Sequence, residues 1–267
     1  MNKSVKLGDI NFQNDAPFVL IAGPCVLESY EHANMMCSKL LQIASELKIQ
    51  LIYKTSYDKA NRTSISSDRG LGIDKSIEIF DKLKKEFNVP IITDVHSVLE
   101  CNQIKDHVDI IQIPAFLCRQ TDLLIAAANT NKIINVKKGQ FLAPWDMENV
   151  VKKIFSTGNR KVLLTERGTS FGYNNLVTDF RSLAIMKKTK LPVIFDATHS
   201  VQIPGGLGVS SGGQYDYVNL LAKASVTASI SAIFLETHEH PKNAPSDGPC
   251  MIPLKKLGKL IQSLKLY

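Results

Sequence analysis

Eight short apolar runs are spread along the chain, and each leads into a residue that can bind an anion or a metal ion. The runs begin near residues 18, 50, 90, 109, 133, 162, 192 and 232, and helical patterns separate them. This alternation predicts a parallel sheet, and near-continuous Ile, Val and Leu predict strands buried on both faces. Chemistry at the carboxyl ends of eight such strands is typical of a (β/α)₈ (TIM) barrel active site. The residues that follow the runs are Cys25, Lys54, Asp94, Gln112, Lys137, Arg167, His199 and Glu236.

The length and composition of the chain fit one barrel domain. Such a domain has about 250 residues, and this chain has 267, of which 44% are hydrophobic and 21% charged. No linker or shift of composition divides the chain, so we expect a single catalytic domain over residues 1–267. Within residues 1–14, Val5–Phe12 around Gly8-Asp9 predicts a short hairpin that caps the amino end of the barrel.

The bulk properties argue against a membrane or secreted protein. No apolar run approaches the roughly 18 residues of a spanning helix, and Met1–Asn14 lacks the apolar core of a signal peptide. The five cysteines form no CxxC pair and no dense framework, which favours reduced thiols. We therefore expect a cytoplasmic protein that does not bind a membrane.

The net charge of +7 leaves two kinds of partner open. The 32 basic residues outnumber the 25 acidic ones, but they are dispersed apart from a modest Lys-rich stretch at Lys255–Lys265. Nucleic acid is one possible partner, and a phosphorylated small molecule in a positively charged cleft is the other. Most of these lysines are explained by simple solvation at the surface. Composition alone therefore does not distinguish between nucleic acid and a phosphorylated small molecule as the partner.

Three connections, Lys54–Asp74, His199–Tyr215 and Thr237–Ile252, are too long for simple turns. Long connections in a compact domain are usually functional, and all three would lie at the same end of the barrel. Gly205–Gly213 fails the GxGxxG pattern, which favours a mobile lid over a dinucleotide site, and we expect no organic cofactor. His238-Glu239-His240 lacks the HExxH spacing of a metal-binding helix, and we interpret it as loop.

Cationic residues at strand ends predict a pocket for a multiply charged anion. A lysine that loses its water at a buried strand end is destabilising unless an anion pairs with it. Arginine adds a planar fork suited to carboxylate or phosphate. A single residue of this kind is more often solvated or salt-bridged, but Lys54, Lys137 and Arg167 occur together. Lys59, Arg62 and Lys138 extend the set.

Cys25, His199, Glu236 and Asp247 form a second candidate group. Thiolate, imidazole and two carboxylates suit Zn²⁺, Fe²⁺ or another divalent transition metal. Because the spacings are long, only a barrel would bring these residues together. A small buried cysteine, a hydrogen-bonded histidine and ion-paired carboxylates explain the same residues, so both readings stay open on residue types alone.

Several long motifs resemble those of the 3-deoxy-D-manno-octulosonate 8-phosphate synthases. The resemblance runs from about residue 16 to the C-terminus and implies a (β/α)₈ fold assembled as a homotetramer. It also implies a transferase of lipopolysaccharide biosynthesis that condenses phosphoenolpyruvate with D-arabinose 5-phosphate and water, giving 3-deoxy-D-manno-octulosonate 8-phosphate and inorganic phosphate. The motifs are Ile21–Cys25, Lys59–Ser64, Val136–Phe141, Leu164–Leu183, Phe195–Gln202 and Ser246–Pro249.

The resemblance further implies which residues bind the two substrates. Those for the phosphoenolpyruvate carboxylate and phosphate would be Lys54, Lys59, Gln112, Lys137 and Arg167. Those for arabinose 5-phosphate would be Asn61, Arg62 and Thr63, with Asp94 and Gln202 near the sugar hydroxyls and Phe116 and Arg119 reaching a neighbouring subunit's sugar-phosphate site.

The resemblance also bears on the metal. The family has a metal-dependent branch and a metal-free branch, which has asparagine where this chain has Cys25. The resemblance therefore implies one divalent ion per subunit, Zn, Fe or Mn, held by Cys25, His199, Glu236 and Asp247. The catalytic residues would be His199, Lys137, Asp247 and Cys25, with His199 also helping to move a proton.

Two other functions remain as alternatives. A sister synthase uses erythrose 4-phosphate in the aromatic amino-acid pathway, but its motif usually reads Lys-Pro-Arg-Thr-Ser, whereas this chain has Lys-Ala-Asn-Arg-Thr-Ser with an inserted Asn61. The extra residue favours the longer sugar. A non-catalytic protein that binds phosphate ligands or nucleic acid would show binding without turnover.

Overall fold

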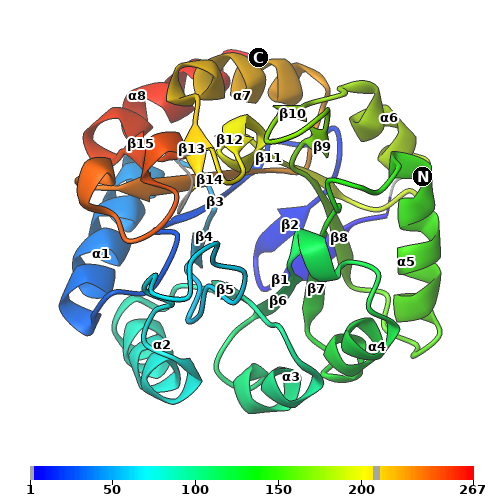
Figure 1. Ribbon diagram of the computed structural model, residues 1–267, viewed down its shortest axis with the longest axis horizontal. Helices are drawn as coiled ribbons and strands as arrows, with labels where there is room; N and C mark the ends of the chain where they lie inside the picture. The colour runs from blue at the N-terminus through cyan, green and yellow to red at the C-terminus, as the bar shows by residue number, and fades with distance from the viewer. Residues whose placement is uncertain (1–2, 207–210) are drawn as a thin grey trace.

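A closed sheet of eight parallel strands forms the centre of the computed structural model, which describes residues 3–206 and 211–267 (Figure 1). Each strand pairs with the next, and β14 pairs with β3 to close the ring. The predicted (β/α)₈ barrel is confirmed, and every strand begins within one residue of its predicted start. The strands are β3 (Val19–Gly23), β4 (Leu51–Lys54), β5 (Ile91–Asp94), β6 (Ile110–Ile113), β7 (Ile133–Lys137), β8 (Val162–Glu166), β11 (Val193–Asp196) and β14 (Ala232–His238).

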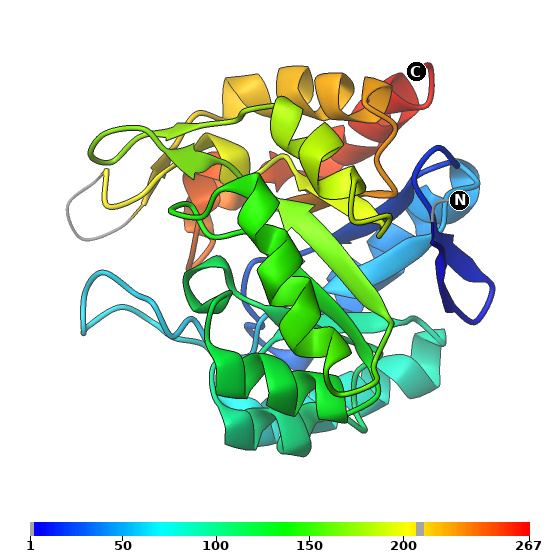
Figure 2. The same cartoon turned by 90° about the vertical axis from the view of Figure 1, so that its right-hand side faces the viewer.

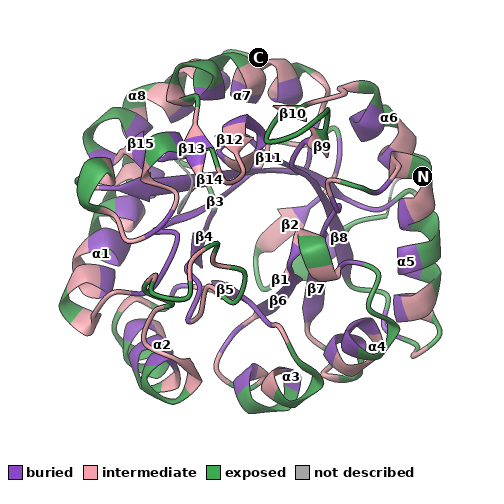
Figure 3. Cartoon of the chain, viewed as in Figure 1, coloured by how far each residue is buried: buried purple, intermediate pink, exposed green. Residues whose placement is uncertain are grey.

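Helices between the strands form the outer layer. Their apolar residues face the sheet and their polar residues face solvent, as the burial pattern in Figure 3 shows. In the first helix, for example, Ala33, Met36 and Leu40 are fully buried against the sheet. The helices are α1 (Tyr30–Glu46), α2 (Ile73–Phe87), α3 (Val98–Ile104), α4 (Thr121–Asn129), α5 (Met147–Phe155), α6 (Arg181–Lys187), α7 (Val218–Thr227) and α8 (Leu254–Leu264).

An N-terminal hairpin closes the amino end of the barrel, as predicted. Strands β1 (Val5–Leu7) and β2 (Ile10–Phe12) pair antiparallel around Gly8, whose φ of 55° suits a tight turn. Val5 and Phe12 belong to the same buried cluster as the inward-facing residues of the barrel strands. Figure 2 shows this hairpin at one end of the molecule and the long connections at the other.

Short elements occupy the long connections at the opposite end. β12 (Gln202–Ile203) pairs with β13 (Gly212–Gly213), and β9 (Thr169–Ser170) pairs with β10 (Leu176–Val177). Residues 207–210 lie outside the described part of the chain, so the lid expected over Gly205–Gly213 stays a prediction. The remaining elements are β15 (Ile252–Pro253) and single 3₁₀ turns at Ala115–Leu117, Pro144–Asp146, His199–Val201, Tyr215–Tyr217, Pro241–Asn243 and Gly248–Cys250.

The interpretation of His238 as loop is wrong. His238 is the last residue of β14 and is 3% exposed. The strand is prolonged because Thr237 and His238 pair with Ile252 and Pro253 of β15, a contact between segments distant in sequence.

In the described part of the chain, none of the helices combines the length and apolar character that crossing a membrane requires.

Candidate active site

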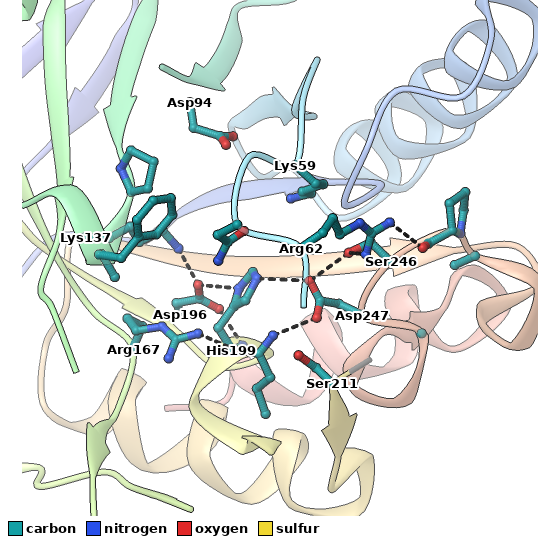
Figure 4. Close-up of a pocket in the computed structure, with 18 of the residues that line it drawn as sticks. Lys59, Arg62, Asp94, Lys137, Arg167, Asp196, His199, Ser211, Ser246 and Asp247 are labelled. Atoms are coloured by element: carbon teal, nitrogen blue, oxygen red, sulfur yellow. Dashed lines mark hydrogen bonds and ion pairs between the residues drawn. The ribbon is translucent and has the colours of Figure 1, made fainter. Parts of the chain in front are cut away.

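A pocket of about 590 Å³ opens at the carboxyl ends of the barrel strands (Figure 4). Its walls come from several strand ends and the connections that follow them, so residues distant in sequence face one cavity. Cys25 and Glu236 are buried and Arg119 is exposed, and none of these three is part of the lining. The predicted site residues in the lining are Lys54, Lys59, Asn61, Arg62, Thr63, Asp94, Gln112, Phe116, Lys137, Arg167, His199, Gln202 and Asp247.

The four residues of the candidate metal group lie together at one side of this pocket. Cys25 Sγ is 3.2 Å from Asp247 Oδ2. His199 Nε2 is 3.6 Å from Glu236 Oε2 and 3.9 Å from Asp247 Oδ2. The ligands of a tetrahedral zinc ion are about 3.5 Å apart, given metal–ligand distances of about 2.0–2.3 Å. The donor atoms and their separations therefore fit a small divalent ion.

An unusual backbone turn orients the Asp247 carboxylate. Asp247 has a φ of 53°, in the left-handed region that aspartate tolerates better than most residues. Gly248 follows it, and a Cβ there would lie 2.2 Å from the carbonyl oxygen of Pro241. Gly248 is therefore required for the turn that brings Asp247 to Cys25, and aspartate tolerates its own place in that turn.

Asp196, at the end of β11, was missed by the sequence analysis. Its Oδ2 is 2.7 Å from Nδ1 of His199, and the same oxygen accepts a hydrogen bond from Lys137 Nζ. With Nδ1 held in this way, the imidazole presents Nε2 to the candidate metal group. Asp196 ends an apolar run as the predicted site residues do, and this signal could have identified it.

The electrostatics of the metal group depend on burial. Burial and the nearby carboxylates of Glu236 and Asp247 hold the pKa of the Cys25 thiol well above its ordinary value. Burial would also raise the pKa of Asp247, but His199 and Lys59 lower it to about 2. The neutral thiol thus donates to a charged carboxylate. A divalent cation would favour the thiolate instead, because metal ligation deprotonates cysteine.

Arg167 leaves an unused donor inside the pocket. Its Nη2 donates to Gln202 Oε1 at 2.8 Å, whereas Nη1 is buried without a hydrogen-bond partner among the described residues. A buried guanidinium N–H without an acceptor is destabilising, and a carboxylate or phosphate is the acceptor that fits it best. Gln202 also donates to Asp247 Oδ1 at 2.6 Å, so it joins this cation to the metal group.

Two lysines complete the charged floor. Lys54 Nζ is 2.8 Å from Glu236 Oε1 and is almost fully buried. Burial lowers the pKa of Lys137 to about 8, against the opposing effect of Asp196 and with the help of the neighbouring cations Lys54 and Arg167. Lys138 is not part of the pocket lining. It is buried, lies 3.5 Å from Glu166 Oε1 and donates to Thr169 Oγ1 at 3.0 Å, so its charge is paired away from the pocket.

Arg62 lies across the mouth of the pocket. Its guanidinium donates to Ser246 Oγ at 2.9 Å and to the carbonyl oxygen of Pro245 at 2.6 Å, which joins the β4–α2 and β14–β15 connections (Figure 4). Asn61 and Thr63 on either side are exposed. Within the described part of the chain, none of the acceptors of Arg62 is a carboxylate, so its positive charge is available to a ligand.

His96 is a second residue that the sequence analysis missed. It lines the pocket, with Nε2 3.2 Å from Asp94 Oδ2 and Nδ1 3.4 Å from Glu100 Oε2. Burial lowers its pKa, but the adjacent carboxylates of Asp94 and Glu100 outweigh this and raise the pKa to about 9. The charged imidazole therefore fixes the Asp94 carboxylate at the pocket wall. Its place two residues after a strand end was the available signal.

Comparisons with known proteins agree on one family. The sequence model of the DAHP synthetase I family matches residues 2–266. A protein of Rickettsia canadensis and one of Rickettsia typhi are each 60% identical over 267 residues, which is 100% of this chain and 97% of theirs. One of Brucella anthropi is 56% identical over 266 residues, 100% of this chain and 96% of its own. All three are named 2-dehydro-3-deoxyphosphooctonate aldolase.

Proposed function

The chain belongs to the DAHP synthetase I family, and from that premise we propose that it condenses phosphoenolpyruvate with D-arabinose 5-phosphate and water. The products are 3-deoxy-D-manno-octulosonate 8-phosphate and inorganic phosphate, for lipopolysaccharide biosynthesis. The name of the relatives supports an eight-carbon product, which three carbons of phosphoenolpyruvate and five of a pentose give. The observation that carries the proposal is one pocket with two arginines: a buried Arg167, whose Nη1 has no acceptor among the described residues, and Arg62 at the mouth.

These two ends of the pocket suit the two anions. Arg167, with Lys54, Lys59, Gln112 and Lys137, binds the carboxylate and phosphate of phosphoenolpyruvate. Asn61, Arg62 and Thr63 bind the phosphate of the pentose, with Asp94 and Gln202 near its hydroxyls. Binding both anions holds C3 of the enol phosphate close to the aldehyde carbon. The reaction between the two bound substrates is then effectively unimolecular.

The chemistry then follows from the substrates. C3 attacks the aldehyde carbon, and positive charge develops at C2 of phosphoenolpyruvate. Water adds to C2 and loses one proton, which balances the proton taken up by the aldehyde oxygen. Phosphate then leaves with cleavage of the C–O bond, as the new C2 hydroxyl loses its proton and becomes the ketone. The aldehyde oxygen requires a proton, and Lys137 is suited to donate it because its pKa of about 8 lies close to neutrality.

We also propose that Cys25, His199, Glu236 and Asp247 hold one divalent ion, Zn, Fe or Mn. The convergence of a thiol, an imidazole and two carboxylates supports this. When bound, such an ion supplies Lewis-acid polarisation of the aldehyde or a lowered pKa for water. Chelation should abolish activity and added metal should restore it. Full activity in protein shown to be metal-free would overturn the proposal.

Comparing two variants under chelator sharpens the metal test. Cys25→Asn recreates the residue of the metal-free branch, so it should retain some turnover, whereas Cys25→Ala should lose more. Equal turnover of the two variants with chelator present would contradict the role given to position 25.

Phosphate release tests the reaction itself. We expect release from phosphoenolpyruvate with arabinose 5-phosphate, and little with erythrose 4-phosphate or without a sugar. Preference for erythrose 4-phosphate would assign the chain to the sister activity, and binding without release would assign it to a non-catalytic class.

We further propose a cytoplasmic homotetramer. Phe116, Phe141 and Trp145 lie in successive connections at the active-site end and are 39%, 59% and 65% exposed. Large exposed apolar side chains of this kind favour a protein interface, and Arg119, exposed near them in sequence, could reach the sugar-phosphate site of a neighbouring subunit. Sedimentation equilibrium should give four times the chain mass, and Trp145→Glu should lower it. A monomeric parent protein would refute the assembly.

A further inference from the structure

Four ligand-type side chains converge outside the pocket lining, close to the segments that carry Cys25 and Glu236. Glu28 lies in the β3–α1 connection and His32 in the first turn of α1. His238 ends β14, and Glu239 follows it. His238 and His32 are buried to 4% and 11% side-chain exposure, whereas Glu28 and Glu239 keep 27% and 31%. The cluster is thus enclosed at its imidazoles and open to solvent at its carboxylates.

Three of these side chains point donor atoms at one another. Glu28 Oε1 is 2.9 Å from His238 Nε2 and 3.7 Å from His32 Nδ1. One ligand atom from each of the three residues lies within 4.8 Å of the others. Without a sulfur ligand, the nitrogen and oxygen ligands of a tetrahedral zinc ion are about 3.4 Å apart, given metal–ligand distances of about 2.0–2.2 Å. The two separations that involve Glu28, 2.9 and 3.7 Å, lie on either side of that value.

His32 has an unsatisfied ligand atom. Its Nε2 is 3.0 Å from Glu239 Oε2, so the N–H of the ring belongs on this side. Its Nδ1 therefore carries a lone pair, and this buried atom has no hydrogen-bond partner among the residues that the structure describes. In the neutral ring, a buried nitrogen without a donor, 3.7 Å from a carboxylate oxygen, is arranged as a metal ligand would be.

Glu239 contacts both imidazole rings through one carboxylate oxygen. The same oxygen that contacts His32 is 3.3 Å from His238 Nδ1. In the structure, that Nδ1 accepts the backbone N–H of His240 at 2.9 Å, so the ring proton is on Nε2 and faces Glu28. An ion at Nε2 takes the place of this proton, and Nδ1 then carries the ring proton and donates it to Glu239. The backbone N–H of His240 gives up its hydrogen bond to Nδ1 when the ion binds. One carboxylate thus orients two histidines, as it does in many metal sites.

We propose that Glu28, His32 and His238 form a second site for a divalent transition-metal ion such as Zn²⁺, with Glu239 as the positioning residue. Two imidazoles and a carboxylate favour Zn, Fe or Ni over Mg or Ca. Glu28 follows Cys25 by three residues and His238 follows Glu236 by two. An ion in the second site would therefore hold in place the two segments that carry Cys25 and Glu236. The site is independent of the reaction proposed above.

Cobalt titration distinguishes the two sites. Co²⁺ bound through Cys25 should give a near-ultraviolet thiolate charge-transfer band, and Co²⁺ at the second site should give only ligand-field bands. We expect two ions per chain in the parent protein. His32→Gln should bind one ion and keep the thiolate band, whereas Cys25→Ser should bind one ion and lose it. Glu239→Gln should weaken the second ion by about 10-fold, a typical effect of losing a carboxylate that orients a histidine ligand.

His107→Gln is the matched control, because His107 also pairs with a carboxylate, Asp81 at 2.8 Å, on an open surface. It should bind as many ions as the parent protein. Glu28→Gln provides a second ligand variant in case His32→Gln unfolds, with thermal melting as the check. Equal stoichiometry and affinity in the parent, His32→Gln and Glu28→Gln proteins would overturn the proposal. If the cobalt-loaded parent protein showed no thiolate band, that would contradict the Cys25 site and leave the second-site result standing.

Discussion

The Asp196 carboxylate is shared between two residues of the proposed mechanism. It accepts hydrogen bonds from Lys137 and from the His199 ring, and it is completely buried. Burial raises its pKa, but His199 and Lys137 outweigh this and hold the pKa well below its ordinary value. Asp196 therefore acts through its neighbours: it sets which His199 nitrogen faces the metal group and keeps a negative charge beside Lys137.

We predict that Asp196→Asn lowers kcat and metal affinity by about 10–100-fold, the typical cost of losing a carboxylate behind a ligand histidine. KM for phosphoenolpyruvate should change less, because a carboxylate in the pocket lining does not itself bind an anion, whereas Arg167 does. Steady-state kinetics and metal titration measure the two effects. Asp179→Asn, at an exposed carboxylate paired with Arg181, should be close to neutral. A large KM change with unaltered kcat would contradict the positioning role.

His96 predicts a pH dependence of stability. Its pKa rises from 6.5 to about 9 on folding, so its contribution is complete below pH 6.5 and is lost as the pH rises to about 9. The difference corresponds to about 3 kcal/mol at most. Between pH 6.5 and 9, the free energy of unfolding should therefore fall more steeply in the parent protein than in His96→Gln. Urea unfolding at several pH values tests this, and parallel curves for the two proteins would refute it.

At the scale of elements, the strands could be predicted because each combines a short apolar run with a polar end. The same rule found the cationic residues Lys54, Lys137 and Arg167. It passed over Asp196 because the predicted run continued past Asp196 toward His199, three residues later, whereas the strand ends at Asp196. His238 could not be placed from local pattern, since its strand is prolonged by pairing with a segment about 15 residues away.

A substitution in the N-terminal hairpin should lower the stability of the protein without changing its activity. Phe12 is fully buried in the cluster that fills the barrel interior, at the end opposite the pocket. Phe12→Ala should therefore reduce the free energy of unfolding by about 3–5 kcal/mol, with kcat unchanged below the melting temperature. Ile10→Ala, in the same hairpin but only partly buried, should cost less. An equal loss for both would show that the hairpin does not insert into the core.

At the scale of the whole molecule, closing the barrel gathers like charges. Lys54, Lys137 and Arg167 come from three strands, and Glu236 and Asp196 offset them only in part. The fold therefore retains a buried donor on Arg167 and an excess of positive charge in one pocket. An anion that binds there relieves both, and its binding should stabilise the entire cooperative unit rather than a local segment.

We predict that phosphoenolpyruvate raises the melting temperature, with stabilisation of about 2.7 kcal/mol at a concentration 100 times its Kd, and that added salt reduces the shift. Arg167→Lys keeps the charge but loses the planar fork that spans two oxygens, so at the same ligand concentration its shift should be much smaller. Arg181→Lys is the matched control, because Arg181 forms a forked pair with Asp179 on the exposed surface. An Arg167→Lys shift equal to that of the parent and control proteins would mean that the unsatisfied Nη1 is not where the anion binds.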